Sequence, residues 1–385
     1  MLIILYIMAD YSIFSSDIKK SKGRMFLEEE DVNRSCFMRD RDRIIHSSAF
    51  RRLKYKTQVF VNNEEDYYRT RLSHSLEVSQ LARSISKVFK VNDDLAESIS
   101  LSHDLGHTPF GHAGEEILNK KMKQFGGFDH NFQALKILVL LEKKYIGFDG
   151  LNLTFETLDG ILKHNGPVIK EVPFFISNFL NFFDGNLKTY GSLESQIAAI
   201  CDDIAYNNND IDDGLYANFF NIEELEQLSI VKKVVKTIKM KKKDTSRLKY
   251  ELVRKLIKLM LDDLIKNTES NLKKYKVLSA NDVISLDKCV VCFSKSMVDD
   301  ELALKNFLKE RMYMHPKIRT MTIKAKKIVS DLFDLYVKEP DLLPKQWIDF
   351  ENEREKHIVV CDYISGMTDK YAINIHKKFF DLYNF

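Results

Sequence analysis

Residues 103–112 read His103-Asp104-Leu105-Gly106-His107-Thr108-Pro109-Phe110-Gly111-His112. The stretch places three imidazoles and one carboxylate close together, and its glycine and proline residues interrupt any helix that leads into it. Neutral imidazole combined with carboxylate suits borderline or hard divalent ions, whereas a set of thiolates would indicate structural zinc. The stretch therefore predicts a metal site with catalytic histidines beside it.

Residues from other helices are needed to complete such a site. His103 and Asp104 are adjacent, and adjacent residues of a helix point about 100° apart, so they share an ion only in a cleft between several helices. His74 lies on the inward face of a helical apolar pattern, and Asp202 lies beside a second apolar stripe. A buried carboxylate is costly unless it is paired or binds a metal. We therefore predict four metal ligands, His74, His103, Asp104 and Asp202, and this quartet resembles the signature of the HD metal-dependent phosphohydrolases.

A His-Asp pair by itself occurs by chance in many proteins, so the prediction depends on the whole quartet and on the histidines close to it. The remaining histidines have no such setting. We interpret them as surface residues or hydrogen-bonded core residues: His46, His164, His315, His357 and His376.

Longer strings of the sequence follow one another in the order found in a single family. They are Arg39–Arg43 with His46, Phe50–Lys54, Thr70–Val78, His103–Glu115, Phe128–Asn131, Ile161–Pro167, Ala199–Tyr206 with Asp210, Asp212, Asp213 and Gly214, Tyr313 with His315, and Tyr363–Asp369. Together they resemble the deoxyguanosine triphosphate triphosphohydrolases and their bacterial homologues within the HD superfamily. The resemblance extends from about Tyr11 to the C-terminus.

The resemblance implies a group of residues that handles protons. His112 and Glu115 would transfer protons at the α-phosphorus, while His107 and His130 would line the same site and contact phosphate. An imidazole of near-neutral pKa that a carboxylate orients can transfer protons at cellular pH. Pro109 also removes the preceding residue from helical geometry, so we expect His107 and His112 on an irregular segment that faces the metal from the side.

The resemblance also implies a substrate-binding set. Arg71 would contact phosphate, and Gln58 would recognise the 3'-hydroxyl of the sugar. Tyr206 and Asp210 would pack against the deoxyribose and surround the phosphate tail, and Tyr313 belongs to the same set. Without the resemblance, Tyr206 would be interpreted as a core tyrosine.

The composition favours long helices. Only 6 prolines and 14 glycines interrupt 385 residues, and no Gly/Ser-rich or Pro-rich linker divides them. We predict an all-α fold, an HD-domain helical bundle with an additional helical C-terminal part, and a short hairpin near Thr57 to Val61. The expected organisation is an N-terminal extension at 1–7, a catalytic core at 8–221, and a C-terminal part at 222–385 that completes the nucleotide pocket and oligomer contacts.

The N-terminus carries no targeting signal that we recognise. Met1–Ile7 is apolar, but it lacks a basic region and is far shorter than the roughly 20 residues of a membrane span. Met8 resembles an ordinary start, so either Met1 or Met8 begins the chain. Five cysteines do not make a disulfide framework, and Cys289 with Cys292 has no second pair for zinc. We therefore expect a cytoplasmic protein with no membrane partner.

One basic stretch stands out from a nearly neutral chain. The formal net charge is only +3, which argues against binding of nucleic acid by the chain as a whole. Lysines and arginines crowd residues 232–249, and we interpret them as a solvated helix face. The alternative is weak binding of nucleotide phosphates or single-stranded nucleic acid.

We predict a metal-dependent dNTP triphosphohydrolase that releases deoxynucleoside and triphosphate, with Mn, Mg or another transition metal such as Fe, Co, Ni or Zn. One alternative is an HD phosphohydrolase for a nucleoside monophosphate or an alarmone, and another is a nucleotide-sensing or nucleic-acid-binding protein with weak catalysis. The resemblance also implies a homo-oligomer, such as a hexamer, and a regulatory nucleotide. The phenylalanine-rich stretch between Pro173 and Gly185 would form either an oligomer contact or a lid over the active site.

Overall fold

The structure is a computed structural model that describes residues 10–59, 67–238, 247–349 and 352–381. Within these ranges the chain forms helices and no strands, and its β-type pairings are three isolated bridges. The predicted all-α fold is confirmed. The expected extension at 1–7 lies outside the described residues. Of the expected hairpin, Thr57 pairs with Thr70 in one isolated bridge, and residues 60–61 lie outside the described part.

The described residues of the first part of the chain form nine α-helices, and serine, threonine and asparagine residues cap several of them. They are α1 (Cys36–Ile45), α2 (Ser48–Arg52), α3 (Arg71–Val88), α4 (Asp93–Ser102), α5 (His112–Lys121), α6 (His130–Lys136), α7 (Phe155–Leu162), α8 (Phe174–Phe183) and α9 (Leu193–Tyr216). Thr70 begins α3 with a capping box, and Asn92 and Ser192 cap α4 and α9 by accepting backbone N–H groups. These caps fix where the helices that carry the site begin.

The second part of the chain continues with eight further α-helices among the residues that the structure describes. They are α10 (Ile222–Leu225), α11 (Ser229–Val235), α12 (Leu248–Lys274), α13 (Ala280–Ser285), α14 (Lys295–Leu308), α15 (Pro316–Lys338), α16 (Glu353–Ser365) and α17 (Asp369–Phe380). Short 3-10 or π turns join some of the elements, among them Leu53–Tyr55, Ile137–Leu141, Lys309–Tyr313 and Lys345–Trp347.

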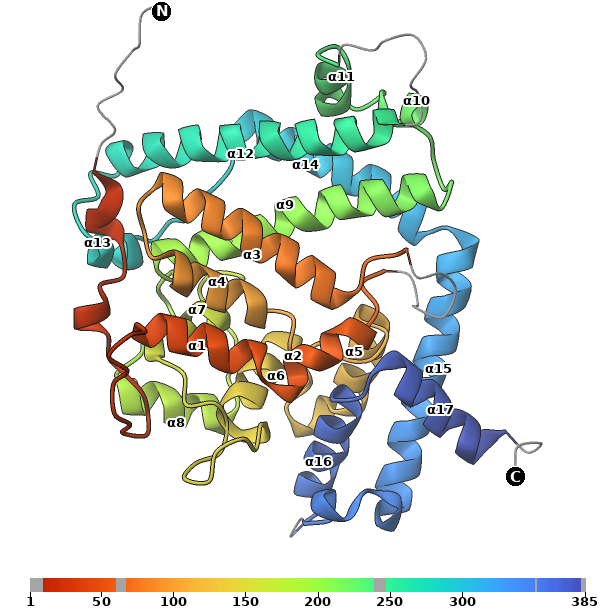
Figure 1. Cartoon of the computed structure of the whole chain (residues 1–385). Coiled ribbons are helices and arrows are strands. Elements are labelled where there is room, and N and C mark those ends of the chain that lie inside the picture. The colour runs from red at the N-terminus through yellow and green to blue at the C-terminus, as the bar shows by residue number, and fades with distance from the viewer. Residues whose placement is uncertain (1–9, 60–66, 239–246, 350–351, 382–385) are drawn as a thin grey trace, which may run out of the picture.

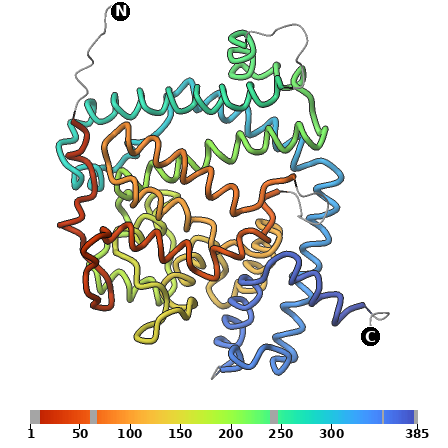
Figure 2. The backbone as a smooth tube through the Cα atoms, in the orientation of Figure 1, coloured from red at the N-terminus to blue at the C-terminus, as the bar shows by residue number. Residues whose placement is uncertain are grey.

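A layer of three helices forms the centre of the molecule. Helix α3 packs along both α4 and α9, and α12 and α14 cover the other side of α9 (Figure 1). The backbone trace shows the last, blue helices returning to the orange segment that contains α5, against which α15 packs (Figure 2). The C-terminal helices therefore lie next to the stretch 103–112 that the sequence singles out.

Three apolar cores hold these layers together. The largest joins α3 and α9 to α12 and α14 and includes Val78, Ile204 and Leu256, all of which are buried. A second lies among α1, α4, α7 and α8, and a third joins α5 to α15 and α16. Because the largest core contains residues from both sides of position 221, the expected division there stays a proposal about chain organisation.

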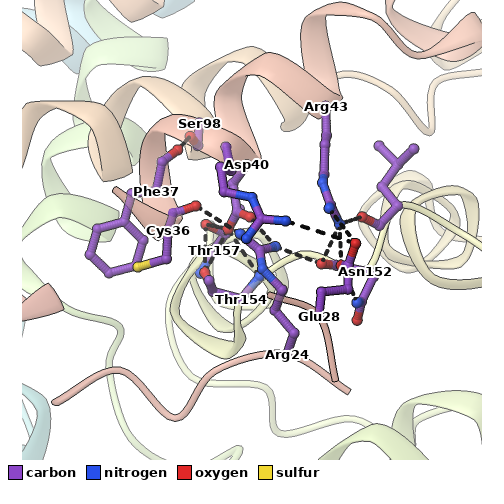
Figure 3. Close-up of polar contacts among 12 residues, drawn as sticks. Arg24, Glu28, Cys36, Phe37, Asp40, Arg43, Ser98, Asn152, Thr154 and Thr157 are labelled. Carbon is purple, nitrogen blue, oxygen red and sulfur yellow. Dashed lines mark hydrogen bonds and ion pairs between the residues drawn. The ribbon is translucent and has the colours of Figure 1, made fainter. Parts of the chain in front are cut away.

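A buried polar cluster attaches α1 to α7 and to the N-terminal segment. The carboxylate of Asp40, which is fully buried, accepts hydrogen bonds from Thr154 N, Thr154 Oγ1 and Thr157 Oγ1 (Figure 3). Arg24 pairs with the same carboxylate, and Arg43 forms an ion pair with Glu28 at 2.8 Å. Each arginine and each carboxylate in this cluster thus has a partner of opposite charge. Such pairing offsets the free-energy cost of burying a charge.

The structure describes the phenylalanine-rich stretch and only part of the basic stretch. The stretch at 174–183 is a helix, and it buries Phe179 and Phe183 in the second core while Phe174 and Phe182 stay exposed. In the basic stretch, Lys233 pairs with Asp300, and residues 239–246 lie outside the described part. No helix in the described ranges is both long and apolar enough to cross a membrane.

Candidate active site

Three helices bring the predicted metal ligands together. His74 is in the first turn of α3, Asp202 is in the middle of α9, and His103 follows the last residue of α4. Because α3, α4 and α9 pack against one another, these residues meet although they are distant in the sequence. Their ligand atoms all lie within 4.8 Å of one another, and we call His74, His103 and Asp202 the metal group.

The donor atoms of the metal group are arranged for an ion. The Nε2 atom of His74 lies 2.8 Å from Asp202 Oδ1, and the Nε2 atom of His103 lies 3.6 Å from the same oxygen. The Nδ1 atom of His103 lies 2.6 Å from the carbonyl oxygen of Ser100, which orients the ring as a metal ligand requires. The Nε2 atom of His103 is buried without a hydrogen-bond partner. An orphaned imidazole nitrogen beside a carboxylate fits a divalent cation.

Asp104, the fourth predicted ligand, lies at the edge of this group. Its Oδ1 atom is 3.5 Å from His103 Nε2, but its Oδ2 atom accepts a hydrogen bond from Arg71 Nη1 at 3.0 Å. The Oδ1 atom is also 3.1 Å from His107 Nδ1. Asp104 therefore stands between the metal group, Arg71 and the next histidine of the stretch. Its role as a ligand stays a proposal.

A histidine that the sequence analysis set aside belongs to the site. His164 is buried, its Nε2 atom lies 3.3 Å from Asp202 Oδ2, and its ring stacks on His103 at 5.1 Å between centroids. It is a hydrogen-bonded core histidine, as interpreted, but the carboxylate that it contacts is a candidate ligand. Its only signal in the sequence was its place in the string Ile161–Pro167.

Electrostatics in the metal group depend on its carboxylates. Burial alone would lower the pKa of His103, but the carboxylates of Asp104 and Asp202 raise it to about 9. Loss of water contact alone would raise the pKa of Asp202, whereas His103, His164 and His74 hold it well below its usual range. The same balance, with Arg71 as the main cation, holds the pKa of Asp104 well below its usual range. The group is therefore strongly anionic at its oxygens, as a cation site requires.

A second cluster joins the four residues expected to handle protons. Glu115 accepts at Oε1 from the backbone N–H of His130 at 3.1 Å, and the same oxygen lies 2.8 Å from His130 Nδ1. Its Oε2 atom lies 3.3 Å from His112 Nδ1, and the rings of His107 and His130 are 4.0 Å apart. We call Glu115, His107, His112 and His130 the proton group. Glu115 thus orients two histidines, one more than the sequence analysis expected.

The members of the proton group differ in their exposure. His112 has 68% of its side chain exposed, whereas His107 is buried. Burial, followed by the nearby Arg71 and His130, holds the pKa of His107 well below its usual range, so this imidazole is neutral. Burial would raise the pKa of Glu115, but its contacts with His112 and His130 lower it. An ionised carboxylate and an accessible imidazole are suited to proton transfer.

The predicted substrate residues fall into two places. Tyr313 donates a hydrogen bond to the carboxylate of Asp210, its Oη atom lies 2.8 Å from Tyr206 Oη, and the Tyr206 ring is 6.1 Å from the His74 ring. Burial raises the pKa of Asp210 to about 8, against the opposing hydrogen bond from Tyr313. Gln58 is buried, and its Oε1 atom has no partner among the described residues. Tyr206 therefore lies beside the metal group, and Gln58 offers a polar atom that a ligand can use.

Residues of the C-terminal part contact the stretch 103–112, although they are distant from it in the sequence. Asp369 Oδ1 accepts from the backbone N–H of Phe110 at 2.8 Å, and its Oδ2 atom accepts from Thr57 N at 2.8 Å and from Thr57 Oγ1. The buried Lys56 ammonium donates to the carbonyl oxygens of Ser365, at 2.9 Å, and His107. The sequence analysis assigned no role to Lys56 or Asp369, because nothing in their spacing connects them to the site.

This attachment holds a strained turn. Phe110 has φ +62° and Gly111 has φ +57°, both in the left-handed region that side chains avoid. A Cβ atom on Gly111 would lie 2.8 Å from Arg71 Nη2, so a side chain at this position would also have to displace this guanidinium. The turn immediately precedes His112 and therefore determines where that imidazole points.

Comparison with known proteins agrees with this geometry. Residues 71–207 match the family model described as HD domain, and residues 291–378 match the Phosphohydrolase-associated domain. A deoxyguanosinetriphosphate triphosphohydrolase-like protein of Parvibaculum lavamentivorans is 50% identical over 382 residues, which cover 96% of each chain. The chain belongs to the deoxyguanosinetriphosphate triphosphohydrolase-like family. Proteins of the same name in Bartonella quintana and Caulobacter sp. are 46% and 47% identical and cover 97% and 96% of this chain, and 96% of their own lengths.

Membership confirms the resemblance that the motifs predicted. The protein is an HD-domain phosphohydrolase, and HD domains of this kind depend on a metal. The HD match contains the metal group and the proton group, while the associated domain contains Ser365, Asp369 and Tyr313. Both matched ranges therefore contribute residues to one region of this chain.

Proposed function

We propose that the protein is a metal-dependent deoxynucleoside triphosphate triphosphohydrolase. Water adds to the α-phosphorus, the bond from this phosphorus to the 5'-oxygen breaks, and the products are deoxynucleoside and intact triphosphate. The observation that supports this best is the contact between the metal group and the proton group through Asp104, which lies 3.5 Å from His103 and 3.1 Å from His107. A phosphoryl group at this junction reaches both sets. The names of the relatives add support for a nucleoside triphosphate substrate.

The cofactor in this proposal is a divalent cation held by His74, His103 and Asp202, with Asp104 as a fourth ligand. When bound, such a cation polarises a phosphoryl oxygen and lowers the pKa of water. Imidazole and carboxylate donors accept Mn and Mg as well as Fe, Co, Ni or Zn, so the donor set by itself does not select among these metals.

The side chains of the chain supply the remaining chemistry. Arg71 is buried beside Asp104, and its Nε atom has no partner, so its guanidinium has a free donor for a phosphate oxygen. His112 is accessible and is oriented by Glu115, which suits it to protonate the departing 5'-oxygen. His107 and His130 lie against each other beside this pair and contact the phosphate.

The deoxyribose end of the substrate lies on the other side of the metal group. The orphaned Oε1 atom of Gln58 accepts the 3'-hydroxyl, and Tyr206 packs against the sugar ring in this arrangement. Tyr313 and Asp210 hold the Tyr206 hydroxyl in place. An additional 2'-hydroxyl meets the aromatic face of Tyr206 and loses its water, so ribonucleotides are poor substrates.

Product analysis tests the reaction type. With Mn²⁺ or Mg²⁺ and each dNTP in turn, phosphorus NMR should show inorganic triphosphate growing with no nucleoside diphosphate or monophosphate. The same assay with GTP should give far less product than with dGTP. Release of phosphate or diphosphate in steps refutes the proposal, as does exclusive hydrolysis of a nucleoside monophosphate or an alarmone.

A further inference from the structure

His164 contacts two members of the metal group without belonging to it. Its Nε2 atom lies 3.3 Å from Asp202 Oδ2, and its ring stacks on the His103 ring with 5.1 Å between centroids and 22° between planes. It is not among the three residues whose ligand atoms all lie within 4.8 Å of one another. His164 is therefore placed to act on two of the metal ligands rather than on the ion.

The backbone around His164 is held by its own turn. The residue follows the end of α7, its N–H donates to Ile161 O at 3.2 Å, and the N–H of Gly166 donates to Lys163 O at 2.8 Å. Helix α7 also packs against α4 and α9, two of the helices that bring the metal group together. None of these contacts uses the imidazole, so the turn after α7 does not by itself require a histidine.

The two oxygens of Asp202 have different partners. Its Oδ1 atom faces the metal group, 2.8 Å from His74 Nε2 and 3.6 Å from His103 Nε2, whereas its Oδ2 atom faces His164. An ionised carboxylate only accepts, so the Nε2 atom of His164 carries the hydrogen and donates it to Oδ2. A carboxylate held at Oδ2 is restrained from rotating, and its Oδ1 atom stays directed at the metal group.

The other nitrogen of His164 indicates that the ring does not serve core stability alone. Its Nδ1 atom is buried and has no hydrogen-bond partner within the described residues. A buried polar atom without a partner lowers stability, and most such atoms in folded proteins are paired. The contact with Asp202 explains why an imidazole occupies this position at that cost.

The other two members of the metal group are held in a similar way. The Nδ1 atom of His103 lies 2.6 Å from the carbonyl oxygen of Ser100, and the Nδ1 atom of His74 lies 3.3 Å from Asn209 Nδ2. Metal-binding side chains are commonly oriented by such partners, and replacing a partner typically weakens metal binding. His164 gives the carboxylate of the group the partner that Ser100 and Asn209 give to its imidazoles.

We propose that His164 is a positioning residue of the metal site. Its Nε2–H group holds Asp202 so that Oδ1 faces the ion, and its ring packs against the ring of His103. The inference rests on the metal site of the proposed function, but it does not depend on the substrate or on the bond that is cleaved.

Glutamine and asparagine give a matched pair of replacements. The amide nitrogen of a glutamine side chain reaches the place of the imidazole Nε2 atom, whereas that of asparagine reaches only the place of Nδ1. His164→Gln therefore keeps a donor toward Asp202, and His164→Asn withdraws it. His164→Phe keeps a ring that can pack on His103 and has no donor.

Binding of Mn²⁺ alone to the full-length, metal-depleted protein measures the effect without any substrate. Free Mn²⁺ is followed by electron paramagnetic resonance during the titration. His164→Asn and His164→Phe should each weaken Mn²⁺ binding by about 10- to 100-fold, and His164→Gln should restore most of the wild-type affinity. His46→Gln, which replaces an exposed histidine outside the site, should bind as the wild type does.

Circular dichroism checks that each variant is folded, and if His164→Asn is unfolded, His164→Phe decides. Equal Mn²⁺ affinity of the folded variants and the wild type overturns this inference and leaves the metal site intact. A complete loss of Mn²⁺ binding in all three variants at position 164, matching that of His103→Ala, overturns it by making His164 a ligand. Failure of the wild type to bind Mn²⁺ overturns the metal site together with this inference.

Discussion

Replacing Asp369 with alanine removes the hydrogen-bond acceptor that attaches the C-terminal part to Thr57 and to Phe110 in the stretch 103–112. Three donors lose their partner: the backbone N–H of Phe110, the backbone N–H of Thr57 and the hydroxyl of Thr57. A buried donor without an acceptor costs about 1 to 3 kcal/mol, so three donors give an upper bound of roughly 9 kcal/mol. Water that enters the vacated space satisfies part of this demand.

The buried carboxylate itself carries a penalty that the replacement removes. Burial raises the pKa of Asp369 against the hydrogen bonds from Thr57 and Phe110. We therefore expect the free energy of unfolding to fall by about 3 to 5 kcal/mol. With its N–H released, the strained turn at Phe110 and Gly111 should relax and displace His112, and a displacement of about 1 Å lowers turnover by about 10²-fold.

Urea unfolding followed by circular dichroism measures the first effect, and kcat with KM measures the second. Metal content should stay at the wild-type level because Asp369 touches no member of the metal group. The matched control is Asp331→Ala, which removes a partly buried carboxylate that holds α17 through His376 at 2.8 Å, and it should change stability by less than Asp369→Ala does and leave turnover normal. If Asp369→Ala unfolds like the control and keeps wild-type kcat, the attachment does not position the site.

Three further predictions concern the metal, the pH dependence and the assembly. His103→Ala should lose bound metal and activity together, whereas His112→Gln should keep its metal and lose about 10²- to 10⁴-fold in turnover, and loss of metal from His112→Gln would make that residue a ligand. Burial lowers the pKa of Lys56 from 10.5 to about 7, so the unfolded chain binds more protons between these values and the free energy of unfolding should rise with pH across this window. A Lys56→Met variant lacks that rise, and identical pH slopes would contradict the reasoning. A homo-oligomer should appear in light scattering and should weaken in Phe174→Glu, because Phe174 is 78% exposed on α8, and a monomer with and without dNTP contradicts it.

The sequence was sufficient for the parts of the site that local patterns encode. Apolar periodicity placed His74 and Asp202 on inward faces, and the capped helices α3 and α9 bring both to His103. The breaks at Gly106 and Pro109 predicted an irregular segment, and the structure has one between α4 and α5. These features depend on residues that are neighbours along a helix, which is why pattern and spacing were informative.

The missing parts depend on contacts between distant segments. Asp369 meets Thr57 across 312 positions, and Lys56 meets Ser365 across 309, so no spacing rule connects them. His164 reaches Asp202 only because α7 packs against α9. Such contacts follow from how the layers of helices pack. The apolar periodicity of a single helix does not specify that packing.

The most direct test of the proposed reaction is hydrolysis of dGTP in water enriched in ¹⁸O, with mass analysis of both products. Attack of water on the α-phosphorus places one ¹⁸O atom in the inorganic triphosphate and none in the deoxynucleoside, because the 5'-oxygen leaves with the sugar. That labelling pattern is the predicted result. Label in the deoxynucleoside, or label in released phosphate or diphosphate, would contradict the proposed cleavage.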